Sequence, residues 1–124
     1  MSNEMIRVLL AGHRGQVGAA LEPALAAAEG IEYVGGVGRG DDLATALREN
    51  RPEVLVDFTH PGAGLDNALA AVAAGAAPVV GTSGIAPEGV DRLERACAEQ
   101  GVGGIVAPNF AVGAVLMMWL AEKA

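Results

Sequence analysis

The sequence is poor in aromatic and basic residues and contains a single cysteine. Aromatic residues make up 3% of its 124 residues, and 8 lysines and arginines stand against 15 aspartates and glutamates, a formal net charge of −7. Such a surface repels phosphate backbones and anionic lipids, so we expect neither nucleic acid nor a membrane as the main partner. Cys97 has no partner for an internal disulfide, which favours a reducing, cytoplasmic location.

Long hydrophobic runs and metal-binding clusters are also missing from the sequence. No stretch has the basic start and apolar core of a signal peptide. The most apolar long segment, residues 111–121, is about half of the roughly 20 residues that a membrane span requires. Only two histidines occur, and they are not grouped with the cysteine, so we expect no metal site.

Short β-rich runs alternate along the chain with alanine-rich stretches, which is typical of a parallel sheet with crossover helices. We predict strands at 6–11, 33–37, 54–58, 78–80 and 104–106, and helices at 16–29, 43–50, 64–74, 88–100 and 112–122. In the helix at 88–100, Cys97 falls on the buried stripe and is expected to be a small core residue. The sequence therefore predicts one α/β domain over residues 1–124, a doubly wound parallel sheet of the Rossmann type.

A glycine-rich segment follows the first predicted strand and has the spacing Gly12-x-x-Gly15-x-x-Gly18. Glycine at these positions removes Cβ atoms that would block a tight turn, the approach of a pyrophosphate and the contact between helix and strand. Amides at the helix start then supply hydrogen-bond donors and partial positive charge to a phosphate. The predicted cofactor contacts of this loop are Gly12, Arg14, Gly15, Gln16, Val17 and Gly18.

The end of the second strand lacks the acid that usually binds the ribose hydroxyls of NAD. Gly38 and Arg39 stand there, and Asp41 and Asp42 come about three residues late. Arg39, with Arg14 from the loop, can instead pair with the 2′-phosphate of NADP, which predicts NADPH binding at least as tight as NADH binding. Arg39 as a solvated turn residue is the alternative.

Three further segments fall at the ends of later strands, where open α/β sheets bind their ligands. They read Val-Asp-Phe-Thr-His-Pro at 56–61, Val-Gly-Thr-Ser-Gly at 80–84 and Ala-Pro-Asn-Phe-Ala-Val-Gly at 107–113. In this order, and together with the glycine loop, they closely resemble the N-terminal domain of the dihydrodipicolinate reductases (4-hydroxy-tetrahydrodipicolinate reductases), oxidoreductases of lysine and diaminopimelate biosynthesis. The resemblance runs over essentially the whole chain.

The resemblance implies NADPH or NADH as cofactor and a role for several strand-end residues. Those implied to lie beside the cofactor are Phe58, Thr59, Gly81, Thr82, Ala107, Asn109 and Phe110, and Ser83 is implied to hold the substrate carboxylate. In this family the catalytic residues and the tetramer contacts lie in a second domain whose motifs are missing here. The resemblance thus implies a chain that contains no catalytic residue and binds cofactor without turning over the small-molecule substrate.

Plainer interpretations stay open for individual residues and for the whole chain. Thr82 and Ser83 fit a simple turn, Asn109 a helix cap, and His60 a loop position, while His13 can at most contact a phosphate. A CoA-binding Rossmann domain like that of succinyl-CoA synthetases also has a glycine loop and a late Gly-Pro-Asn type of segment. A stand-alone nucleotide-sensing module that never had a second domain is the other alternative.

Overall fold

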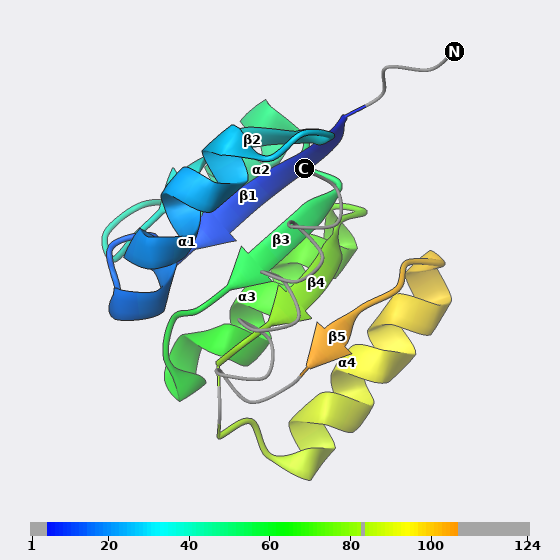
Figure 1. Ribbon diagram of the computed structural model, residues 1–124. Helices are drawn as coiled ribbons and strands as arrows, with labels where there is room; N and C mark the ends of the chain where they lie inside the picture. Colours follow the sequence, from blue (N-terminus) through cyan, green and yellow to red (C-terminus); the bar gives the residue numbers. More distant parts are fainter. Residues whose placement is uncertain (1–4, 83, 107–124) are drawn as a thin grey trace.

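A computed structural model describes residues 5–82 and 84–106 of the protein and shows a single parallel sheet between layers of helices (Figure 1). The strands are β1 (Ile6–Ala11), β2 (Ile31–Val37), β3 (Val54–Asp57), β4 (Ala77–Val80) and β5 (Ile105–Val106). The helices are α1 (Gln16–Ala27), α2 (Leu43–Asn50), α3 (Pro61–Ala73) and α4 (Pro87–Gln100). All strand pairs are parallel, in the order β2-β1-β3-β4-β5, so the predicted α/β Rossmann-type class is confirmed.

Alternating side chains of the central strands form the two faces of the core. Val8 and Leu10 of β1 pack with Leu21 and Leu25 of α1 on one face. On the other face, Leu9 packs in a cluster with buried residues of α2, β3 and α3. A third cluster joins α3, β4 and α4. The helices therefore cover both faces of the sheet. The carboxyl ends of the strands lie together at one edge, where a ligand can bind.

The strand order reverses direction next to β1, because the chain passes from β1 to β2 on one side and later returns to β3 on the other. Ligands of open α/β sheets bind in the crevice at such a switch point. In this fold the crevice lies between the loops that follow β1, β2 and β3. The glycine loop occupies its centre, since it directly follows β1.

A β-bulge interrupts the pairing of β1 with β2. Val8 pairs with Tyr33, but Leu9 pairs with Gly35, so Val34 is an extra residue. Gly35 has φ of +142°, a conformation that favours glycine. Because of the shift, Val37 joins Leu9 in the core cluster of α2 instead of following Tyr33 to the α1 face.

One predicted boundary was wrong by three residues, and the other boundaries of the described elements agree within two. Helix α3 begins at Pro61 rather than at residue 64, because proline is well suited to a first helical turn. Strand β2 begins at Ile31, two residues before the prediction. Cys97 is buried in the third cluster, as predicted. The predicted helix at 112–122 lies outside the described residues.

Within residues 5–82 and 84–106, no helix is both long and apolar enough to cross a membrane. The same part of the chain contains no group of histidine, cysteine and acidic side chains arranged to hold a metal ion.

Candidate nucleotide-binding site

The glycine loop turns so tightly that side chains are excluded at two of its glycines. Gly12 has φ of +88°, and a Cβ atom there would lie 2.6 Å from the carbonyl oxygen of Phe58. A Cβ atom at Gly18 would lie 1.9 Å from the carbonyl oxygen of Gly12. The amide of Gly15 donates to that same carbonyl at 3.0 Å and closes the turn. Gly15 is also the N-cap of α1 and brings no side-chain cap, so the helix start is suited to an anionic ligand.

A cleft of about 650 Å³ lies beside this loop at the carboxyl edge of the sheet. Six of the predicted cofactor contacts line it: Gly12, Arg14, Gly15, Arg39, Phe58 and Thr59. His60, Ala63 and Asn67 complete the side toward α3. Gln16, Val17, Gly18, Gly81 and Thr82 do not line the cleft, although Gly18 shapes the loop that does. Ser83, Ala107, Asn109 and Phe110 lie outside the described residues.

Two acids in the loop after β2, Asp41 and Asp42, accept hydrogen bonds from backbone amides close to them in the sequence. The carboxylate of Asp41 accepts a hydrogen bond from the amide of Gly38 at 2.8 Å. Asp42 is the N-cap of α2 and accepts hydrogen bonds from the Ala44 amide and from the Thr45 hydroxyl. The carboxylate of Asp41, which the sequence places late, thus returns to the end of the strand and lines the cleft.

His13 packs across the end of β2 in space left open by two glycines. A Cβ atom at Gly36 would lie 2.4 Å from Cγ of the ring, and one at Gly38 would lie 3.3 Å from Cε1. Nδ1 of His13 is buried and has no hydrogen-bond partner among the described residues. Arg14 reaches the same place, since its Nη1 lies 3.5 Å from the Cβ position of Gly38. The side chains of His13 and Arg14 therefore adjoin the position where an NAD-binding Rossmann domain usually carries an acid.

Sequence reasoning missed a buried carboxylate in the same region. Asp57, the last residue of β3, is 0% exposed and accepts hydrogen bonds from three side chains. The Thr82 hydroxyl donates at 2.6 Å, the Asn67 amide at 3.0 Å, and the Thr59 hydroxyl at 3.0 Å to each carboxylate oxygen. The signal in the sequence was an acid at the end of an otherwise apolar strand, two residues before a threonine.

Thr82 lies on the inner side of this network. Its side chain is 3% exposed, and its hydroxyl hydrogen is directed at Asp57. Gly64 of α3 makes the approach possible, because a Cβ atom there would lie 3.1 Å from Cβ of Thr82 and 3.3 Å from a carboxylate oxygen of Asp57. A cofactor in the cleft would therefore meet Thr59 and Asn67 before Thr82.

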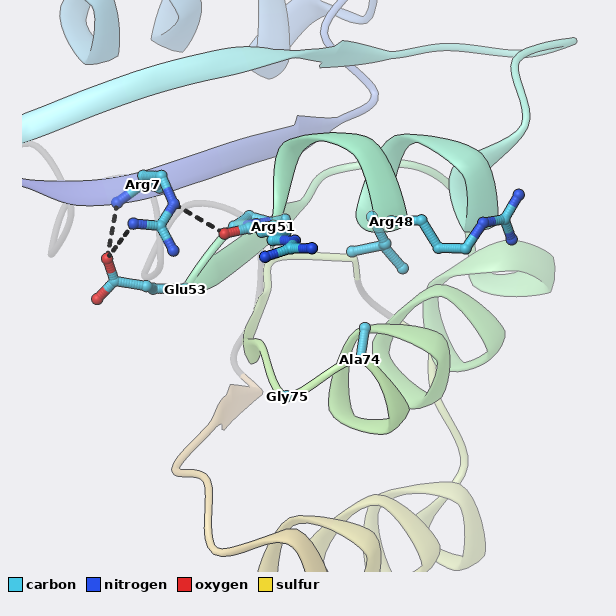
Figure 2. Close-up of a pocket in the computed structure, with 8 residues that line it drawn as sticks. Arg7, Arg48, Arg51, Glu53, Ala74 and Gly75 are labelled. Carbon is cyan, nitrogen blue, oxygen red and sulfur yellow. Dashed lines mark hydrogen bonds and ion pairs between the residues drawn. The ribbon is translucent and has the colours of Figure 1, made fainter.

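A second cavity, of about 780 Å³, lies at the opposite edge of the sheet, where α2 and α3 end (Figure 2). Three arginines line it with Glu53. Nε of Arg7 donates to the carbonyl oxygen of Arg51 at 2.8 Å, and its Nη1 lies 3.5 Å from Glu53. Arg48 lies in the last turn of α2 and Arg51 is its C-cap, where cations interact favourably with the helix dipole. We assign these arginines a structural role at the helix end.

Comparison with known proteins agrees with this geometry. A family model described as "Dihydrodipicolinate reductase, N-terminus" matches residues 6–110. The chain belongs to the dihydrodipicolinate reductase family. A 4-hydroxy-tetrahydrodipicolinate reductase from Coxiella burnetii (strain CbuG_Q212) is 40% identical over 119 residues, which are 96% of this chain and 50% of that protein. One from Mycolicibacterium smegmatis is 42% identical over 120 residues, again 96% of this chain and 49% of that protein.

Solved structures give the same family and the same fold. A dipicolinate-bound dihydrodipicolinate reductase from Paenisporosarcina sp. TG-14 has a TM-score of 0.81 at 28% identity, over 95% of this chain and 52% of that one. A scyllo-inositol dehydrogenase from Lactobacillus casei, with a TM-score of 0.73 at 12% identity over 86% of this chain and 37% of that one, shows the fold alone. The family model and the reductase relatives do not favour the CoA-ligase alternative. The chain spans about half the length of the reductases it matches.

Proposed function

We propose that residues 1–124 form the dinucleotide-binding domain of a reductase that converts 4-hydroxy-tetrahydrodipicolinate to tetrahydrodipicolinate with NADPH or NADH. The observation that carries the proposal is the glycine-lined cleft at the reversal of strand order, in a chain of the dihydrodipicolinate reductase family. The bound cofactor would supply the hydride. The chain's own residues would hold and orient it: the amides at the start of α1 at the pyrophosphate, and Phe58 and Thr59 beside the nicotinamide half.

We infer further that NADPH binds at least as tightly as NADH. Arg14 and Arg39 line the cleft at the end of β2, and residue 38 contributes no side chain that would bind the ribose hydroxyls or repel a 2′-phosphate. The carboxylate of Asp41 opposes a phosphate there, but it already accepts the amide of Gly38. The two arginines therefore outweigh the single acid.

Calorimetric titration of the 124-residue chain with NADPH, NADH and CoA tests both proposals. We expect both dinucleotides to bind and CoA not to bind. Arg39→Ala is expected to weaken NADPH by about tenfold, the loss of one charge-assisted contact, and to leave NADH unchanged. A clear preference for NADH in the parent chain would overturn the cofactor proposal. If Arg39→Ala changes neither affinity, Arg39 is a solvated turn residue.

We propose that catalysis and substrate binding need a second domain, which closes on the cofactor and carries the tetramer contacts. Hydride transfer requires donor and acceptor at near-attack distance with water excluded, and one open cleft does not provide this. Ser83 would hold the substrate carboxylate, while Ala107, Asn109 and Phe110 would wall the nicotinamide. The expected result is cofactor binding by residues 1–124 without turnover of 4-hydroxy-tetrahydrodipicolinate. Measurable reductase activity of this chain alone would disprove the proposal.

A further inference from the structure

Asp57 joins three segments of the candidate site that are far apart in the sequence. Its carboxylate accepts from Thr59 in the loop after β3, from Asn67 in α3 and from Thr82 after β4. The carboxylate is fully buried, and no arginine, lysine or histidine pairs with it among the described residues. Within the described residues the buried carboxylate is therefore stabilised by hydrogen bonds and not by an ion pair. Each donor side chain is held in the orientation that directs its hydrogen at Asp57.

Two of these donors also line the cleft, and Asp57 decides what they can offer a ligand there. A threonine hydroxyl has one hydrogen, so Thr59, which donates it to Asp57, can only accept at its remaining lone pairs. Asn67 donates one of its two Nδ2 hydrogens to Asp57, which orients the amide and leaves the other hydrogen as a donor, and its Oδ1 accepts no hydrogen bond from the described residues. The cleft wall after β3 is therefore rich in hydrogen-bond acceptors.

Strand order places this acceptor-rich wall opposite the basic end of the cleft. The glycine loop follows β1 in the centre, Arg39 follows β2 on one side, and Thr59 follows β3 on the other. A dinucleotide whose pyrophosphate lies on the loop spans both sides. Its phosphorylated adenosine suits the arginines, and its nicotinamide riboside, which carries hydroxyl and amide donors, suits the acceptors.

We propose that Asp57 is a positioning residue that holds Thr59 and Asn67 as hydrogen-bond acceptors for the donor groups of the nicotinamide riboside half of the cofactor. The inference rests on the proposed function, because it names how one half of the same cofactor is recognised. It assigns Asp57 no contact with the ligand itself. Its effect passes entirely through the two side chains that it orients.

Calorimetry with two probes separates this role from a merely structural one. NADPH carries both halves of the ligand, whereas adenosine 2′,5′-bisphosphate carries only the half expected at the basic end. In the full 124-residue chain, Asp57→Asn is expected to weaken NADPH at least about tenfold and to change the bisphosphate affinity by less than about twofold. General damage to the domain would weaken both ligands alike, and that result would overturn the proposal.

Thr59 supplies a second, independent pair of variants. Thr59→Ser keeps the hydroxyl and is expected to bind NADPH like the parent chain, while Thr59→Val is expected to bind it about tenfold more weakly. If Asp57→Asn does not fold, this pair decides: equal NADPH affinity of the two variants overturns the proposal. A parent chain that binds neither probe would instead disprove the proposed function, and this inference with it.

Discussion

The hydroxyl of Thr82 donates to the carboxylate of Asp57 at 2.6 Å across a sequence separation of 25 residues, and both side chains are buried. The bond joins the segment after β4 to the end of β3, so it holds these two neighbouring parts of the carboxyl edge of the sheet together. Its removal would leave a buried carboxylate with one donor fewer and no water to replace it.

Thr82→Val is therefore expected to lower the free energy of unfolding by about 1–3 kcal/mol. Thr45 offers a matched control, since its hydroxyl donates to Asp42 over the same 2.6 Å at an exposed site. Thr45→Val is expected to cost less than about 1 kcal/mol, because water can replace the lost partner. Urea denaturation of both variants measures the two costs, and equal values would contradict the buried role of Thr82.

Residue 38 is expected to control the choice between the two dinucleotides. An aspartate at Gly38 would bring a carboxylate within reach of Arg14, whose Nη1 lies 3.5 Å from the Cβ position. Gly38→Asp should therefore bind the ribose hydroxyls, draw Arg14 away from a 2′-phosphate, and lower the NADPH-to-NADH affinity ratio by about tenfold or more. Gly38→Ala adds the same Cβ atom without charge. Titrations in which Gly38→Ala shifts the ratio as far as Gly38→Asp would rule out this electrostatic explanation.

The left-handed residues at two helix ends predict stability changes of opposite sign. Arg51, after α2, has φ of +45°, the single positive value among the described non-glycine residues, and Gly101, after α4, has φ of +71°. Arg51→Gly relieves strain and keeps the carbonyl that Arg7 contacts, so a gain of about 0.5–1 kcal/mol is expected.

Gly101→Ala should instead lose about 1 kcal/mol, and since nothing lies within 4 Å of its Cβ position, the loss would be purely conformational. Thermal unfolding of both variants checks the signs. If Arg51→Gly destabilises the fold, the contacts of the Arg51 side chain around the second cavity contribute more free energy than its backbone strain costs.

Asp42 predicts how stability changes with pH in acid. The hydrogen bond from the Thr45 side chain, followed by those from backbone amides, holds the pKa of this carboxyl below its ordinary value. A lowered folded-state pKa stabilises the fold above the unfolded-state pKa, and this contribution is lost as pH falls through the folded-state pKa. Asp42→Asn keeps a good N-cap but does not titrate. Melting temperatures from pH 6 to about pH 2 should therefore fall less steeply for the variant; parallel curves would contradict this role.

The sequence was most informative where a local pattern decides the structure. The limits of β1 and α2 follow from an apolar run before Gly12 and from the capping residue Asp42, and both agree with the structure. The glycine loop was likewise predictable, because a positive φ and a close approach of backbone segments both require a residue without a Cβ atom, which only glycine provides. The family followed from the strand-end segments, and the comparisons confirm it.

What the sequence did not reveal depends on contacts between distant residues. Asp57 meets Asn67 and Thr82 because β3, α3 and β4 converge at one edge, and a linear pattern does not encode that distance. Asp41 is similar, since its position suggests that it comes too late to matter, yet its side chain folds back to Gly38. The hydrogen-bond partners of both acids are determined by the fold of the backbone and not by their separation along the sequence.

The bulge at Val34 shifts the register of β2, and so it decides which residue stands at the end of that strand, where the choice between NADPH and NADH is expected to be made. Pairing partners on either side of it differ by one, so Gly36 and Gly38 lie on the His13 side while Val37 lies in the core. An alignment that omits Val34 would shift by one residue the position at the end of β2 where an NAD-binding Rossmann domain usually carries its acid, and a graft of an unbulged strand end would do the same. Exchanges of this segment between homologues should therefore take the bulge and the strand end together.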